Sequence, residues 1–317
     1  MKKPILGLAV VAGLASCGGG GNPFDPVSVA APPPAAPTAA PAPAPAPAPA
    51  SIVPASLSQD LQSFTYDPAN QTLSITGVGA DDGPLAGTYR RRPGLDRAGY
   101  EAYTAQDGSL DRHVTAYVRD IRGTRAAVIV TGVQFEEIFA GSAFSNTTFS
   151  APVPPGTQQD GGLVTYAGTY VGLLNGPGST EDLEAVAPNT NPAVLSGQSA
   201  EVTGSVVITG DFTDSTVSGV IFNRNVIDNQ AVSPANIALD RTAIAANGTF
   251  QGAATQNDGG VGEYAGIFGG TGATEVAGTI RASGHIDGLQ NVIENGAFVL
   301  SQCGQADEDA VCNQPVP

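Results

Sequence analysis

The chain has 317 residues, with 41 glycines, 25 prolines and no tryptophan. Lysine and arginine together number 13 against 29 acidic residues, and the resulting formal net charge of -16 excludes a nucleic-acid partner because like charges repel. The prolines are concentrated before residue 55, whereas glycines are spread through the later part of the chain. This composition predicts one disordered tether followed by a turn-rich β body.

Residues 1–17 have the order of a secretory signal, with a basic pair at positions 2 and 3, a short apolar stretch over 5–14 and the motif Leu-Ala-Ser-Cys ending at Cys17. This order resembles the bacterial lipobox, in which the chain is cut before the cysteine. The resemblance implies a diacylglycerol on Cys17 and an acylated amine, hence attachment to a membrane through lipid. Because Gly18 follows instead of aspartate, we expect delivery to the outer membrane, on its cell-surface or periplasmic face. An ordinary signal peptide with an incidental cysteine is the alternative.

Residues 18–56 form the predicted tether, with a glycine run at 18–21 and almost only alanine and proline over 30–50. Proline fixes φ and removes a backbone donor, so this segment should sample polyproline II rather than a helix or a sheet. At about 3.1 Å per residue, its roughly twenty Ala and Pro residues would hold the body on the order of 60 Å from the membrane. A proline-rich recognition ligand is the competing interpretation, although alternating Ala and Pro offers no specific side chains.

Period-2 patterns separated by turn residues predict a small N-terminal β domain over residues 57–150. Its expected strands are 61–66, 72–77, 86–90, 100–105, 114–120 and 124–132. Most of the arginines lie here, which indicates either a contact patch for an acidic partner or, more simply, solvated strand ends and turns. They are Arg90, Arg91, Arg92, Arg97, Arg112, Arg119, Arg122 and Arg125.

A Pro- and Gly-containing linker is expected at 151–162, before a second domain at 163–302. Its expected strands are 163–174, 202–210, 216–222, 236–244, 249–255, 263–268, 274–282 and 297–301. Eight antiparallel strands with mostly short turns predict a closed up-and-down barrel filled by side chains. Gly266 and Gly278, in the middle of two strands, indicate tight bending or the close approach of another backbone. The strand at 202–210 alternates most cleanly, with one apolar and one wet face.

The connection over residues 175–200 is the exception to the short turns, and it carries the acidic run Glu181-Asp182-Leu183-Glu184. Loops of this length are often functional or mobile, so we expect an interaction surface here. In the tail at 303–317, Cys303 and Cys312 are expected to form a disulfide, because Cys17 is assigned to lipid. A metal pair is the alternative, but neither His113 nor His285 stands at a ligand spacing from these cysteines.

Several short segments of the second domain resemble one known family. Residues 207–212 (VITGDF) and 215–221 (STVSGVI) resemble paired barrel strands of transferrin-binding protein B and related surface lipoproteins, and residues 247–252 (NGTFQG) look like the next hairpin limb. Residues 266–270 (GIFGG) with 273–278 (ATEVAG) resemble the family's signature hairpin. The resemblance covers about residues 163–301 and implies a single handle-plus-barrel unit. It also implies a non-catalytic binding function, as in iron-acquisition lipoproteins.

Motifs for catalysis are missing from the sequence: it has no nucleophile elbow, P-loop, zinc-protease helix or dinucleotide fingerprint. The adjacent acids Asp81-Asp82 and Glu136-Glu137 would point to opposite faces of a strand and could not share a proton. His285 is either a lone base at a barrel mouth or, more simply, a solvated turn residue. We therefore expect no enzyme and no cofactor, and a protein partner of unknown identity. A structural envelope lipoprotein without a dedicated ligand is the alternative.

Overall fold

The computed structural model describes residues 51–77, 87–135, 137–152, 162–229 and 231–317. The predicted signal peptide with Cys17 and nearly all of the tether lie outside these ranges, as does most of the linker predicted at 151–162. Residues 50–317 form one compact unit. Within the described ranges, no helix combines the length and hydropathy that a membrane span requires.

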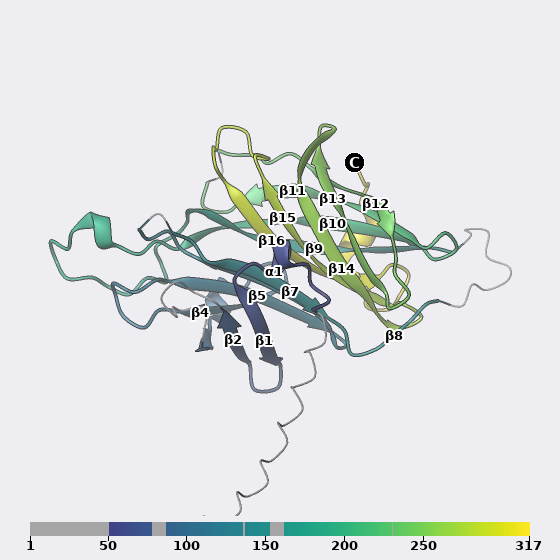
Figure 1. Cartoon of the computed structure of the whole chain (residues 1–317), viewed down its shortest axis with the longest axis horizontal. Helices are drawn as coiled ribbons and strands as arrows, with labels where there is room; N and C mark the ends of the chain where they lie inside the picture. Colours follow the sequence, from purple (N-terminus) through teal and green to yellow (C-terminus); the bar gives the residue numbers. More distant parts are fainter. Residues whose placement is uncertain (1–50, 78–86, 136, 153–161, 230) are drawn as a thin grey trace, which may run out of the picture. The chain divides into compact units, whose positions relative to one another are not determined.

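The first part of this unit is a sheet of seven strands that pair in sequence order, here called the handle sheet (Figure 1). Its strands are β1 (Leu61–Asp67), β2 (Thr72–Gly77), β3 (Gly87–Arg91), β4 (Glu101–Ala105), β5 (Val114–Ile121), β6 (Thr124–Thr131) and β7 (Ala140–Ser145). Six of these lie where the sequence predicts strands, and β7 was not predicted. Its sequence AGSAFS lacks a polar-apolar alternation because both of its faces are mostly buried.

The second part is a barrel of eight antiparallel strands, each hydrogen-bonded to the next, with the last strand paired to the first. The strands are β9 (Leu163–Pro177), β10 (Ser199–Asp211), β11 (Thr216–Val226), β12 (Ile237–Ala243), β13 (Thr249–Gln256), β14 (Gly259–Thr271), β15 (Glu275–Ser283) and β16 (Ile293–Gln302). A two-residue strand, β8 (Phe149–Ser150), pairs in parallel with β14. The predicted fold class, an all-β chain with a closed up-and-down barrel, is confirmed.

The barrel interior is filled by aromatic and aliphatic side chains, and two glycines make room for the rings. Gly266 of β14 and Gly278 of β15 are directly paired in register. A Cβ atom at Gly266 would lie 2.4 Å from the ring of Phe250, and one at Gly278 would lie 2.3 Å from the ring of Phe298. Carbonyl oxygens of the paired strand are almost as close. The expected close approach is thus made by rings as well as by backbone.

A second apolar layer joins the handle sheet to the outer face of the barrel. Tyr100 from the handle sheet donates its hydroxyl proton to the Thr169 carbonyl at 3.1 Å and accepts the Val299 N–H at 2.9 Å, so one side chain bonds two barrel strands. The short helix α1 (Ala55–Ser58) contributes the fully buried Leu57 to the same layer. The predicted domain boundaries stay a prediction.

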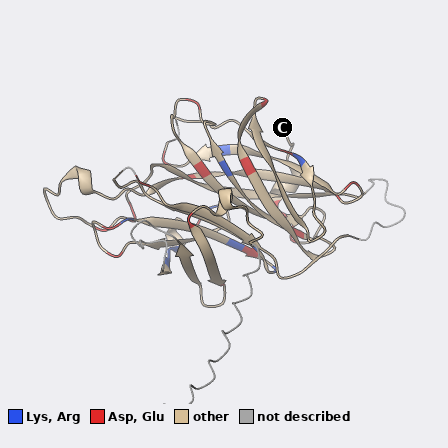
Figure 2. Cartoon of the chain, viewed as in Figure 1, with Lys and Arg blue, Asp and Glu red and all other residues tan. Residues whose placement is uncertain are grey.

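The arginines of the handle sheet are mostly paired with carboxylates; Figure 2 marks the backbone positions of the basic and acidic residues. Two of them reach the barrel: Arg97 contacts Glu201 at 2.6 Å and Arg122 contacts Glu275 at 2.5 Å. Further pairs are Arg91 with Asp96, Arg92 with Asp182, Arg112 with Glu137, Arg122 with Asp307 and Arg125 with Asp120. Most of these arginines therefore meet acids of the same chain, which the sequence did not predict, while Arg90 is exposed to solvent; a contact patch for an acidic partner stays a prediction.

The C-terminal tail packs on the outside of the barrel. Cys303 and Cys312 form the predicted disulfide, with 5.6 Å between their Cα atoms. The bridge holds the turn η3 (Ala310–Asn313), whose Val311 packs against Val207 of β10. The outward face of β10, predicted to be wet, is therefore covered at Val207, because a tail distant in sequence folds over it.

Candidate functional site

The connection between β9 and β10, residues 178–198 and here called the long loop, folds back onto the end of the handle sheet. The His113 N–H donates to Ser196 Oγ at 2.9 Å, and the Gly197 N–H donates to the Val133 carbonyl at 3.1 Å. Gly132 packs so closely that a Cβ atom there would lie 1.7 Å from the Gly197 oxygen. A segment that the sequence marks as functional or mobile is thus fastened to the handle sheet at its C-terminal end.

Asp182 fastens the other half of the long loop. Its two carboxylate oxygens contact different handle residues, Arg92 Nε at 2.9 Å and His113 Nε2 at 2.9 Å. His113 is 1% exposed. Burial lowers the pKa of His113, the Asp182 carboxylate opposes that effect, and the positive charge of Arg92 adds to it. No local pattern in the sequence predicts this contact, because 69 positions separate His113 from Asp182.

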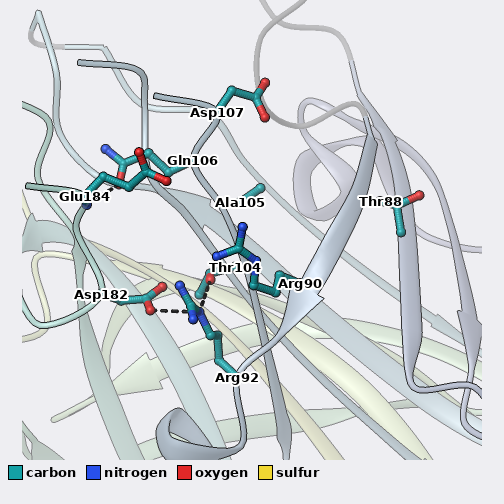
Figure 3. A pocket seen from close by; sticks show the side chains of 9 residues that line it. All are labelled: Thr88, Arg90, Arg92, Thr104, Ala105, Gln106, Asp107, Asp182 and Glu184. Atoms are coloured by element: carbon teal, nitrogen blue, oxygen red, sulfur yellow. Dashed lines mark hydrogen bonds and ion pairs between the residues drawn. The ribbon is translucent and has the colours of Figure 1, made fainter. Parts of the chain in front are cut away.

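A polar hollow of about 120 Å³ lies beside this contact, between the handle sheet and the long loop (Figure 3). Figure 3 shows the Arg90 side chain in it, with Asp107 and Glu184 towards one side and the Arg92–Asp182 pair towards the other. The Glu184 N–H donates to Gln106 Oε1 at 2.9 Å, which fixes the loop along the rim. The Arg90 side chain makes no ion pair or hydrogen bond with any described residue, although its backbone is paired with β4.

Three exposed apolar side chains lie on three segments at this end of the handle sheet, and together they are called the apolar tip. They are Leu110 at 47% exposure, Phe135 at 61% and Val186 at 40%. Gln134 ties the segments together, since its Nε2 donates to the Leu110 carbonyl at 2.7 Å and to the Val194 carbonyl of the long loop at 3.1 Å.

Phe135 of the apolar tip has a φ of 54°, in the left-handed region that bulky side chains rarely adopt. The turn that carries it is closed by the Glu137 N–H, which donates to the Gln134 carbonyl at 3.1 Å. Arg112 holds the same turn through the Glu137 carbonyl and carboxylate at 3.1 and 3.0 Å. Phe135 is not among the residues predicted from the sequence, although an aromatic residue within the polar run Gln-Phe-Glu-Glu is a usable signal.

A second group of polar side chains is sealed inside the barrel. Glu294 accepts hydrogen bonds from Tyr170 at 2.6 Å, from His285 at 2.8 Å and from Arg224. Burial would raise the pKa of Glu294, but Arg224, His285 and Tyr170 together lower it to about 2. His285 is therefore neither a solvated turn residue nor a lone base at the barrel mouth. Both predictions are wrong, because His285 is buried and contacts the carboxylate of Glu294 on β16.

The remaining candidate residues are distributed as follows. Asp81, Asp82, Glu136 and Cys17 lie outside the described residues. Glu137 pairs with Arg112 rather than with a second acid. In the described part of the chain, no three His, Cys, Asp or Glu side chains are grouped so that they could hold a metal ion.

The sequence matches no protein-family model and no curated protein. The structure is similar to that of a transferrin-binding protein B double mutant from Haemophilus parasuis Hp5, with 16% sequence identity and a TM-score of 0.40. It is also similar to intact Ap-TbpB with its N and C lobes, with 14% identity and a TM-score of 0.39. A third similar structure is the isotype 1 transferrin-binding protein B of serogroup B Neisseria meningitidis, with 16% identity and a TM-score of 0.37. These are structures of the family that the sequence segments resemble.

The matched region covers 76–77% of this chain. It covers 45% of the Haemophilus parasuis chain, 46% of the Ap-TbpB chain and 42% of the Neisseria meningitidis chain. The chain therefore spans less than half the length of the structures it matches.

Proposed function

We propose that the chain is a non-catalytic binding protein, anchored by lipid to the outer membrane, that holds a protein partner at the apolar tip of the handle sheet. The observation that carries the proposal is Phe135, an exposed aromatic side chain in a backbone conformation that costs free energy. We assign an external contact as the physical reason for this exposure.

The surroundings of Phe135 fit a protein partner. The apolar tip is bordered by the Arg112–Glu137 ion pair and by the polar hollow, where the Arg90 side chain has no partner among the described residues. An apolar centre with a polar rim is the usual composition of protein interfaces, whose binding energy is concentrated in aromatic and arginine residues. The turn is also held rigid by Gln134 and Arg112, so little conformational entropy is lost when a partner binds.

The binding test compares two exposed apolar residues. The purified full-length protein is used to capture cell-envelope and environmental proteins, and the dissociation constant of each captured protein is measured. Phe135→Ser should weaken a true partner by tenfold or more, since burying one aromatic side chain contributes about 1.5–3 kcal/mol. Leu163→Ser, at a position 54% exposed outside the apolar tip, is the matched control and should change nothing.

A protein captured equally by the wild type and by Phe135→Ser would contradict the proposal. Capture of nothing would favour a structural envelope lipoprotein instead.

The anchor is tested separately at Cys17. Cells grown with radioactive palmitate should label the wild-type protein but not Cys17→Ala, and mass spectrometry should find the acyl chains on the mature N-terminus. Protease added to intact cells then distinguishes display on the cell surface from display towards the periplasm. A mature N-terminus without lipid would remove the anchor from the proposal and leave the apolar tip unaffected.

A further inference from the structure

One of the contacts that fasten the long loop to the handle sheet depends on the protonation of a buried histidine. We infer that His113 and Asp182 form a proton-sensitive latch, which holds the long loop in place at neutral pH and releases it under mildly acidic conditions. The latch is inferred from the contacts between the long loop and the handle sheet. Its effect on partner binding rests on the proposed function.

The two ring nitrogens of His113 have different surroundings. Nε2 faces Asp182 Oδ2 at 2.9 Å, so in the neutral ring this nitrogen carries the proton and donates it to the carboxylate. Nδ1 is buried and has no hydrogen-bond partner among the described residues. A second proton must go to Nδ1, where it would create a buried donor without an acceptor. Such a group costs about 1–3 kcal/mol.

The charges around the imidazole also disfavour a second proton. The Asp182 carboxylate is already shared with Arg92, whose Nε lies 2.9 Å from Oδ1, so protonating the buried His113 would give this partly exposed group a net positive charge. From the turn between β6 and β7, the nearby acid Glu137 is paired with Arg112. The other acids of the loop segment, Glu181 and Glu184, are exposed to solvent.

The sign of the pH effect follows from these contacts. Burial and Arg92 keep the pKa of His113 below its ordinary value of 6.5 while the loop is attached. When the loop detaches, the ring meets water and its pKa returns towards 6.5. Above that pH both states are neutral and pH has no effect. As the pH falls below it, the detached state takes up the proton first and is favoured. Acidification therefore opens the latch.

Opening the latch would dismantle the apolar tip. The long loop supplies Val186 and also the Val194 carbonyl, which accepts a hydrogen bond from Gln134 beside Phe135. Detachment of the loop moves Val186 away from the apolar tip and breaks the hydrogen bond between Gln134 and Val194. The turn that carries Phe135 then loses one of the contacts that hold it. Affinity for a partner at the tip should fall with acidification.

The test measures the latch in the full-length protein without any partner. The chain has only 2 histidines, so an NMR titration of the imidazole nitrogens resolves both rings. Hydrogen exchange of the long-loop amides, corrected for the intrinsic effect of pH, is followed between pH 7.5 and 5.5. We expect a His113 pKa below 6.5, and protection of the Gly197 amide that falls about tenfold for each unit of that depression.

Two variants separate the latch from a general acid effect. In His113→Gln the Nε2 amide can still donate to Asp182 but does not titrate, so protection should stay constant with pH. Glu181→Gln, which changes an exposed acid in the same loop, should keep the wild-type profile. A His113 pKa at or above 6.5, or the same loss of protection in His113→Gln, would overturn the inference. The wild-type titration tests the latch even if a variant does not fold. It also tests the latch if no partner is found, because the measurement requires no partner.

Discussion

At the scale of single residues, the barrel interior shows how closely glycine and aromatic positions depend on each other. Gly278 lies under the ring of Phe298, and Gly266, paired with it, lies under Phe250. A larger side chain at either position would require the ring or a paired-strand carbonyl to move. The glycines are therefore part of the packing and do not merely allow bending.

Gly278→Ala should destabilise the protein by about 1–3 kcal/mol, because its methyl group overpacks a filled interior. The measurement is the free energy of unfolding in urea. Gly176→Ala is the matched control, since a Cβ atom there meets nothing within 4 Å. Equal effects of the two substitutions would mean that Phe298 moves aside without cost.

Glu294 makes a second residue-scale prediction, about acid stability. Its pKa is about 2 in the folded barrel, against an ordinary value of 4.5. The ionised carboxylate therefore stabilises the fold above pH 4.5, and about 3 kcal/mol of stability is lost as the pH falls from there towards 2. Glu294→Gln should be less stable at neutral pH and should lose less on acidification. Parallel curves of unfolding free energy against pH for the two proteins would contradict this.

At the scale of elements, ion pairs join the handle sheet to the barrel. Glu201 of β10 is 2% exposed and burial raises its pKa, while Arg97 from the segment between β3 and β4 counteracts this at 2.6 Å. Arg122 pairs with the buried Glu275 of β15 at 2.5 Å. Because the carboxylates are buried, each arginine is needed to keep a barrel strand free of an unpaired charge.

Arg97→Met should leave Glu201 buried without its cation and should cost about 3–5 kcal/mol at pH 7. The cost should shrink at pH 5, because the pKa of Glu201 rises further and the carboxyl group can become neutral. Arg90→Met, which removes an arginine without a partner among the described residues, should change the unfolding free energy by no more than about 0.5 kcal/mol. A similar small effect for Arg97→Met would show that water reaches Glu201.

At the scale of the whole molecule, residues 50–317 are held together by a shared apolar layer. Most strands of the barrel are longer than the sequence predicts, and β9 has 15 residues; β12 is shorter than predicted, with 7. The barrel interior is mostly apolar and encloses the Glu294 group, while exposed polar contacts such as Gln251 with Glu263 lie on the outside.

The shared layer predicts that the handle sheet and the barrel unfold together. Calorimetry of the full-length protein with its disulfide intact should show one transition. Leu57→Ala, which leaves a cavity between the two parts, should lower the free energy of unfolding by about 2–5 kcal/mol. Leu110→Ala, at an exposed position, is the control and should leave the transition in place. Two separate transitions would instead support independent folding domains.

The sequence by itself determined the fold class and the strand positions, because period-2 alternation and turn residues act locally. It also located the disulfide, since so few cysteines leave one pairing once Cys17 is assigned. It missed β7, whose small residues are buried on both faces and carry no alternation. Only the tertiary structure decided what the arginines pair with, that His285 is buried beside Glu294, and that Asp182 fastens the long loop to His113. These contacts join residues far apart in the chain, and their energies depend on burial, which no local pattern records.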